Sequence, residues 1–108
     1  MSLAAGHEHA AVFAALGDAT RLSLIEELAG GERRSITQLA GGSNLTRQAI
    51  TKHLRVLEDV GIVHSQRAGR QSLFALDPEP IREANEFLDI VSAQWDRALG
   101  RLKTFVDE

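Results

Sequence analysis

The chain has 108 residues, a formal net charge of −3 and no cysteine. This length accommodates one domain with a modest hydrophobic core, and the lack of cysteine excludes disulfides and thiolate metal sites. No apolar run approaches the roughly 18–20 residues of a membrane span. Residues 1–10 lack the basic start and long apolar stretch of a signal peptide. We therefore expect a cytoplasmic protein with no membrane association and a single domain over residues 1–108.

The N-terminal part of the chain predicts two short helices. Residues 8–17 are rich in alanine and end at Gly17, while residues 1–6 are expected to form a disordered tail. Asp18 suits the N-cap of a second helix, whose apolar residues recur with a helical period until a glycine pair ends it.

A helix-turn-helix follows over residues 37–60. The segment RRSI fits one short strand, Thr37 is expected to cap a small helix, and the glycine pair 41–42 forms a turn. A longer helix then lies within residues 43–60 and ends before a glycine.

The charged residues gather around this longer helix. Residues 1–42 hold three cations and five acids, and residues 77–108 hold four cations and eight acids. Residues 43–76, by contrast, hold five cations and only two acids. A basic middle between acidic ends predicts that one surface meets an anionic partner.

The longer helix has one basic face and one apolar face. Its segment TRQAITKHLR, residues 46–55, carries three cations and no acid. On a helical wheel an arc of about 140°, opposite Ile50 and Leu54, holds Arg47, Gln48, Thr51, Lys52 and Arg55. Surface helices often alternate Glu with Lys, whereas here the first acidic residue is Glu58. A solvated basic face remains the alternative for this helix taken alone.

The chemistry of the basic face suits duplex DNA. Arginine and lysine match guanine edges or phosphates, glutamine matches adenine, and threonine matches either a base or a phosphate. The residues expected to contact double-stranded DNA from this helix are Thr46, Arg47, Gln48, Thr51, Lys52 and Arg55.

A β-hairpin, or wing, is predicted over residues 62–76, with its turn at Ala68-Gly69-Arg70. It carries three further residues expected to contact DNA, Arg67, Arg70 and Gln71. A helix-turn-helix followed by a basic wing reads DNA through the major groove and the adjacent backbone or minor groove. The predicted fold class is therefore mainly α with a β-hairpin wing, a winged helix-turn-helix.

The last helix is predicted over residues 78–106, with Asp77 as its N-cap and Pro78 at its first position. Apolar residues recur there at alternating spacings of three and four from Ile81 to Phe105, which is a heptad pattern. A helix of this length exceeds what so small a domain can bury, so a second copy is the simplest partner. Covering the domain's own core is the alternative. The residues expected at the dimer interface are Phe13, Leu88, Val91, Trp95, Ala98, Leu102 and Phe105.

The histidines indicate no metal centre. His7 and His9 lie near the N-terminus, where an unstructured tail outweighs metal binding. His53 falls on the inner side of the basic helix and is expected to be hydrogen-bonded and to position that helix. His64, on the first wing strand, suggests no role. No nucleophile elbow, phosphate-binding glycine loop or paired-carboxylate motif is present, so enzymatic function is not expected.

At these residues the chain resembles the ArsR-type winged-helix repressors. The segments ALGDATRLSLIEEL, ITQLA and LTRQAITKHLRVLEDVGIVHSQRAGRQSLFAL carry the resemblance, which includes a Thr-x-His-Leu to Gly-Ile-Val pattern from Thr51 to Val63. It implies a homodimeric transcriptional repressor that binds a palindromic operator, often its own promoter. Ala19 departs from the proline that the family commonly has there.

The resemblance is to a cysteine-free branch of that family. Many members bind metal through a Cys-x-Cys-type motif in the small helix, or through histidine and acidic residues on the last helix. Here the matching stretch SITQLAGG has no thiolate, and residues 77–108 contain no histidine. We expect neither a metal nor a cofactor, and the sequence names no effector ligand, although a pocket between dimer helices near Trp95 stays open. A winged-helix module that binds an acidic protein, without specific DNA binding, is the alternative function.

Overall fold

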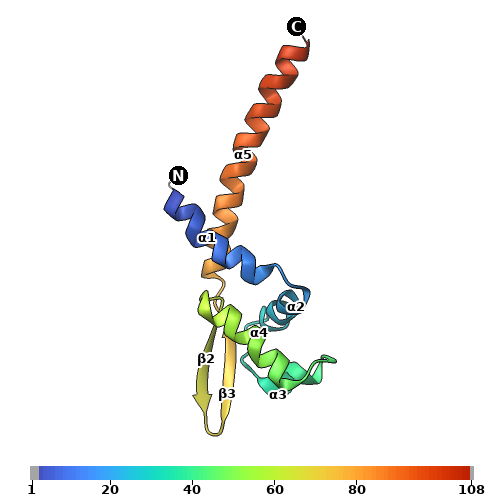
Figure 1. The fold of residues 1–108 in the computed structure, drawn as a ribbon, viewed down its shortest axis with the longest axis vertical. Helices are drawn as coiled ribbons and strands as arrows, with labels where there is room; N and C mark the ends of the chain where they lie inside the picture. Colours follow the sequence, from blue (N-terminus) through green and yellow to red (C-terminus); the bar gives the residue numbers. More distant parts are fainter. Residues whose placement is uncertain (1–2, 108) are drawn as a thin grey trace.

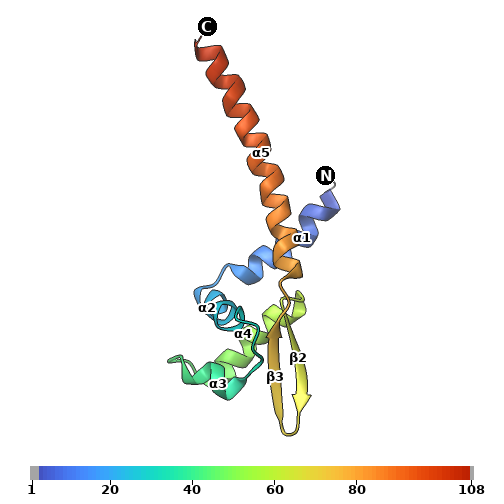
Figure 2. The same ribbon diagram turned by 180° about the vertical axis from the view of Figure 1, so that it is seen from behind.

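The computed structural model describes the backbone of residues 3–107 and the side chains of residues 9–107. Figures 1 and 2 show a small helical body, a projecting hairpin below it and one long helix that extends away from both. The elements are α1 (Leu3–Leu16), α2 (Ala19–Leu28), β1 (Arg34–Ser35), α3 (Ile36–Gly41), α4 (Arg47–Asp59), β2 (Val63–Ala68), β3 (Gln71–Leu76) and α5 (Glu79–Asp107). The predicted winged helix-turn-helix is confirmed.

The first helix is longer than predicted. It begins at Leu3, so residues 3–6, expected as part of a disordered tail, are helical, while residues 1 and 2 lie outside the described part. Alanine, which has the highest helix propensity, stands at positions 4, 5, 10, 11, 14 and 15. The helix therefore extends toward the N-terminus without a regular apolar stripe. Asp18 caps α2 as predicted, and its carboxylate accepts a hydrogen bond from the backbone N–H of Arg21.

The cap of α3 differs from the prediction. Ser35, not Thr37, is its N-cap: the Ser35 hydroxyl accepts from the backbone N–H of Gln38, and the Gln38 side chain accepts from the backbone N–H of Ser35. This reciprocal capping box satisfies two backbone donors at once. Thr37 therefore lies inside the first turn, and its side chain is exposed.

The second helix of the motif, α4, begins after Thr46, whose hydroxyl accepts from the backbone N–H of Ala49. Ile50, Leu54 and Leu57 recur at helical spacing and are completely buried. The helix ends at Asp59, and Gly61, two residues beyond, adopts φ +80°. This left-handed conformation suits glycine because it has no Cβ to clash with the backbone.

The wing is a β-hairpin within a three-stranded antiparallel sheet of order β1-β3-β2. Its two long strands pair from Val63 with Leu76 to Ala68 with Gln71, so the turn falls at Gly69 and Arg70 as predicted. β1 adds only two residues to the opposite edge of β3. The sheet therefore holds the base of the hairpin against the helical body and leaves its tip free (Figure 1).

The core lies where α1, α2, α3 and α4 meet the base of the wing and the start of α5. Its buried apolar residues are Val12, Ala15, Leu24, Leu28, Leu39, Ile50, Leu54, Leu57, Ile62, Val63, Phe74 and Ala84. All the longer elements contribute to this core, and the apolar face of α4 packs into it through Ile50, Leu54 and Leu57. This packing fixes which face of α4 points outward.

The long helix α5 begins at Glu79 rather than at Pro78, and Asp77 accepts a hydrogen bond from the backbone N–H of Glu79. Only its first turns pack on the body, chiefly against α1, and Ala84 is its one fully buried residue among those described. The rest projects freely, so the molecule measures 68 × 28 × 21 Å (Figure 2). Its radius of gyration is 18.4 Å, against about 13 Å for a compact domain of this length.

Candidate nucleic-acid interface

The exposed face of α4 is cationic. Arg47, Gln48, Lys52 and Arg55 are all exposed, while the buried face holds Ile50 and its apolar partners. Because the apolar side chains anchor one face of the helix in the core, the cations on the other face are held toward solvent. The amphipathic arrangement predicted from the sequence is present.

The cations of this surface are not neutralised by neighbouring carboxylates. Among the side chains of residues 9–107, the ion pairs are Arg34–Glu32, His53–Asp18, His64–Asp77 and Arg82–Glu79. None of them involves an arginine or a lysine of α4 or of the wing, since the members that these elements contribute are the histidines His53 and His64. An uncompensated group of positive charges raises the local electrostatic potential, which attracts anions.

Two adjoining hollows lie along this face. The first lies between α3 and α4 and is lined by Ile36, Thr37, Arg47, Gln48, Thr51 and Lys52. The second lies between α3, α4 and the wing and is lined by Ser35, Ile36, Thr37, Arg47, Arg70, Gln71 and Ser72. Arg47 borders both hollows, so Gln48, Thr51 and Lys52 of α4 adjoin two of the three predicted wing residues, Arg70 and Gln71.

The remaining predicted residues lie around these hollows. Thr46 is exposed, but its hydroxyl already caps α4. The Thr51 hydroxyl donates to the carbonyl of Arg47 at 2.8 Å, which leaves its lone pairs and methyl group available. Arg55 follows Arg47 by about 12 Å along the helix axis. Arg67 is exposed on β2, opposite Ser72 on β3.

Sequence reasoning missed four residues that line the hollows, Ser35, Ile36, Thr37 and Ser72. Thr37 was assigned to the cap of α3, which concealed its place on the surface. The Ser-x-x-Gln spacing of residues 35–38 is the signal that identifies Ser35 as the cap and frees Thr37. No comparable signal marks Ser72, because its place depends on how the hairpin packs beside α3.

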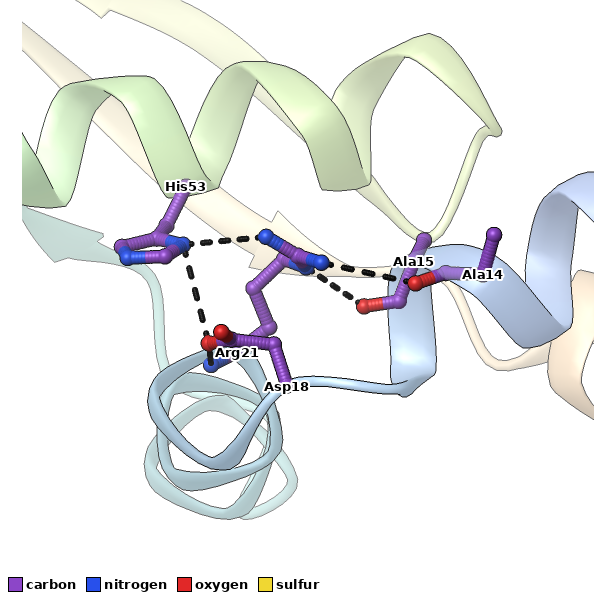
Figure 3. A network of polar contacts seen from close by, with 5 residues as sticks. All are labelled: Ala14, Ala15, Asp18, Arg21 and His53. Atoms are coloured by element: carbon purple, nitrogen blue, oxygen red, sulfur yellow. Dashed lines mark hydrogen bonds and ion pairs between the residues drawn. The ribbon is translucent and has the colours of Figure 1, made fainter.

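A polar network joins α4 to α1 and α2 (Figure 3). Helical spacing puts its α4 member, His53, on the side of the helix away from the cationic face. His53 Nδ1 lies 3.2 Å from Nη1 of Arg21 and 3.8 Å from the carboxylate of Asp18. This confirms that His53 is a packed, hydrogen-bonded residue. The backbone N–H of Arg21, together with the nearby positive charges, holds the pKa of Asp18 below its usual value of 3.8.

The other histidines differ from expectation. The sequence suggested no role for His64, and the structure places its Nε2 2.9 Å from the carboxylate of Asp77, where the wing joins α5. This hydrogen bond lowers the pKa of Asp77, with help from the backbone N–H of Glu79. His9 belongs to α1 rather than to an unstructured tail, and its ring packs on Phe87 at 5.4 Å between centroids. The side chain of His7 lies outside the described residues.

Over the part of the chain that the structure describes, no three histidine or acidic residues gather in a way that would hold a metal ion. Among the same residues, no helix has the length and apolar character needed to span a membrane.

The exposed part of α5 is unusually apolar. Its exposed large hydrophobic residues are Leu88, Ile90, Val91, Trp95, Leu99, Leu102, Phe105 and Val106. Five of these residues were predicted at a dimer interface: Leu88, Val91, Trp95, Leu102 and Phe105. Ala98, which was also predicted there, is half-buried. Phe13 differs, because it is half-buried against the core and packs on Phe87 at 6.1 Å between ring centroids.

Comparisons with known proteins agree with this geometry. Residues 16–66 match the family model of a helix-turn-helix domain. The chain is 38% identical over 78 residues to the HTH-type transcriptional regulator YuzN of Bacillus subtilis, covering 67% of this chain and 85% of that protein. An ArsR-like transcriptional regulator from Rhodococcus is 34% identical, superposes with a TM-score of 0.88, and is covered over 97% of its length by 99% of this chain.

A third relative is a homodimer. The homodimeric winged helix-turn-helix DNA-binding domain of an ArsR-family candidate from Mycobacterium bovis is 25% identical, with a TM-score of 0.64 and coverage of 86% of this chain and 82% of that one. From its sequence, its fold and these relatives, the chain belongs to the ArsR-like helix-turn-helix transcriptional regulators, which bind DNA and are not enzymes.

Proposed function

We propose that the chain acts as a homodimeric repressor that binds a palindromic operator, which can be in its own promoter. Each protomer would place α4 in the major groove and the wing beside it, and two copies joined along α5 would read the two halves of the site. The observation that carries this proposal is the pairing of one cationic surface with one exposed apolar helix on the same small chain.

The composition of the cationic surface supports duplex DNA as the partner. Arg47 and Gln48 stand on the first turn of α4, whose residues reach base edges in helix-turn-helix proteins, and Lys52 follows one turn later as a phosphate contact. Arg70 and Gln71 at the tip of the wing extend the same surface toward a flanking phosphate or minor groove. The full proposed contact set is Thr46, Arg47, Gln48, Thr51, Lys52, Arg55, Arg67, Arg70 and Gln71.

The exposed stripe of α5 supports a two-fold dimer. Trp95 is 64% exposed, Leu102 is 59% exposed and Phe105 is 76% exposed. Apolar side chains in such numbers on one face of a protruding helix mark a protein interface. The heptad spacing favours another helix as the partner, and the Mycobacterium bovis relative is homodimeric. We propose Leu88, Val91, Trp95, Ala98, Leu102 and Phe105 as its contacts, with Phe13 supporting α5 from α1.

A two-fold dimer determines the form of the operator. Two recognition helices related by a two-fold axis read half-sites about 34 Å apart, which is one turn of the duplex, or a multiple of that spacing. The two half-sites are inverted with respect to each other because the protein surfaces are.

In vitro selection from a randomised duplex pool tests the proposal. We expect an inverted-repeat consensus, and fluorescence anisotropy should give much tighter binding to it than to a scrambled duplex. Sedimentation velocity should give a dimer, free and on DNA. Placing the consensus over a promoter should then lower transcription of a reporter when the protein is present.

Each part of the proposal has its own contrary result. A dimer that selects no consensus would favour the alternative winged-helix interaction module. A consensus without two-fold symmetry would contradict the palindromic operator, and higher reporter transcription would indicate an activator.

A further inference from the structure

We propose that Arg21 is a positioning residue that fastens the back of the recognition helix to the C-terminal end of α1, and thereby sets the separation of the two recognition helices in the dimer. This inference rests on the proposed function, because the separation has meaning only for a dimer on a two-part operator.

The guanidinium of Arg21 connects two elements (Figure 3). Its Nε donates to the carbonyl of Ala15 at 2.6 Å, and Nη2 donates to the carbonyl of Ala14 at 3.4 Å. Its Nη1 lies 3.2 Å from Nδ1 of His53 on α4. One side chain on α2 thus joins the last turn of α1 to the middle of α4.

Arginine suits this position for reasons of geometry. The last carbonyls of a helix lack partners within the helix, and α1 ends at Leu16. The carbonyl of Ala14 also accepts from the backbone N–H of Gly17 at 3.2 Å, so Ala15 is the carbonyl that depends most on Arg21. A planar guanidinium presents several N–H groups in fixed directions, so it can serve two carbonyls and a third acceptor together. A lysine has a single ammonium on a flexible stem and cannot reproduce that fork.

The contact also assigns a role to each nitrogen of His53. A guanidinium has only donors, so Nδ1 of His53 must accept from Arg21. Neutral His53 therefore carries its proton on Nε2. Only 24% of the His53 side chain is exposed. It lies behind α4 on the opposite side from the cationic face, so it acts on DNA only through the helix that carries it.

The polar network connects the helix proposed to form the dimer, α5, with the helix proposed to contact DNA, α4. α5 carries the exposed apolar stripe, α1 packs on the base of α5, Arg21 holds the end of α1, and His53 belongs to α4. A tilt of α4 about its buried apolar face moves its N-terminal residues relative to the two-fold axis. Loosening Arg21 should therefore change how strictly the dimer discriminates operator spacing more than it changes the attraction to DNA in general.

The first experiment measures binding against spacing. The selected inverted repeat is rebuilt with zero, one, two or three base pairs inserted or removed at its centre, and binding of the full chain is measured by anisotropy. Wild-type protein should prefer its own spacing over the others by about tenfold or more, since each misplaced half-site loses base contacts.

Variants isolate the contact. Arg21→Ala should reduce the spacing preference to within about threefold while changing affinity for a scrambled duplex less than twofold, because the charge that it removes lies behind α4. Arg21→Lys should behave like Arg21→Ala. His53→Gln keeps a side-chain acceptor and should retain most of the preference, whereas His53→Leu should lose it. Arg82→Ala removes an equally charged, exposed arginine, which pairs with Glu79, and serves as the control.

A second readout requires no DNA. Long-range ¹H–¹⁵N spectra of the imidazoles report which nitrogen carries the proton. At a pH where the ring is neutral, His53 should be the Nε2–H form in the wild type and in Arg82→Ala, and a mixture of both forms in Arg21→Ala. Thermal melting and sedimentation of each variant confirm that it remains a folded dimer.

The outcomes separate the two proposals. If wild-type protein selects no inverted repeat or shows no spacing optimum, the proposed function fails and this inference fails with it. If the wild type has the optimum, and folded Arg21→Ala keeps both the optimum and the Nε2–H form of His53, the inference alone is overturned. A change in the tautomer with an unchanged optimum also overturns it, since the contact then has no effect on spacing.

Discussion

Gln48 and Lys52 lie one turn apart on the exposed face of α4, yet their chemistry suits different parts of a duplex. The Gln48 amide can donate and accept at once, as the edge of adenine requires, whereas the Lys52 ammonium is a point charge that suits a phosphate. Arg70, exposed at the tip of the hairpin, resembles Lys52 in suiting a phosphate.

We expect Gln48→Ala to relax specificity at one base position, at a cost of about 1–3 kcal/mol on the preferred sequence. Lys52→Ala and Arg70→Ala should weaken binding on all sequences alike and reduce the salt slope by about one unit each. Anisotropy titrations at several salt concentrations, on the consensus and on single-base variants, distinguish the two patterns. Uniform loss with Gln48→Ala would place that residue on the backbone instead.

Asp18 gives a prediction about acid stability. Its pKa is lowered in the folded protein, so its charged form stabilises the fold above the ordinary value of 3.8, and this contribution is lost as the pH falls through the lower, folded pKa. The wild type should therefore lose Tm below about pH 4 more steeply than Asp18→Asn, which can cap α2 without a charge. Thermal melts from pH 6 to pH 2.5 check this, with Glu86→Gln on the exposed face of α5 as a control.

Helix α4 contains both residues that the sequence placed correctly and a contact that it could not predict. The cationic face of α4 was predictable because helical period alone separates it from Ile50 and Leu54. The contact of His53 with Arg21 joins residues 32 positions apart, and only the packing of α2 against α4 brings them together. The sequence therefore predicted that His53 faces inward, but it could not predict Arg21 as its partner.

Among the elements, the wing depends most on one residue. Gly69 has φ +64°, a conformation that costs residues with a Cβ about 1 kcal/mol or more, although no atom lies within 4 Å of the position a Cβ would take. Any effect of substitution there comes from the backbone rather than from crowding.

Gly69→Ala should accordingly lower the free energy of unfolding by about 1 kcal/mol and weaken DNA binding, because Arg70 would leave its place beside the second hollow. Gly30→Ala is the matched control, since that glycine also has open space but no left-handed backbone. Urea titrations of both variants test the difference. Equal stability of the two would show that the hairpin turn tolerates a side chain.

Element positions followed closely from local patterns where those patterns were strong. The hairpin turn at Gly69 and the end of α4 before Gly61 were predicted from glycine alone, and both residues adopt positive φ. The start of α1 was wrong because alanine prolongs a helix without an apolar stripe. The cap of α3 was wrong because two hydroxyl residues compete within three positions, and the side-chain hydrogen bonds decide between them.

On the scale of the whole molecule, the dominant feature is an apolar helix with nothing against it along most of its length. The heptad predicted it from sequence, but sequence could not separate the residues that pack on the domain's own core, such as Ala84, from those that remain open, such as Leu88. Which residues of α5 are covered depends on how far along α5 the contact with α1 extends.

Leu102→Glu should convert the proposed dimer into a monomer, because a charge would be buried in the helix pair without a partner. The monomer makes about half the phosphate contacts, so the dependence of log affinity on log salt should fall to roughly half of the wild-type slope. Sedimentation velocity and anisotropy measure the two effects. Ala93→Glu places the same charge on the opposite, exposed side of α5 and should leave the dimer intact.

Trp95, in the middle of the exposed stripe, is the chain's single tryptophan, and the chain contains no tyrosine. Its intrinsic fluorescence therefore comes from one indole at the proposed seam, 64% exposed in the isolated protomer. Burying that indole against a second copy should shift its emission to shorter wavelength, and dilution should reverse the shift. The protein thus has a built-in optical probe of its own monomer–dimer equilibrium, readable at low concentration without any label.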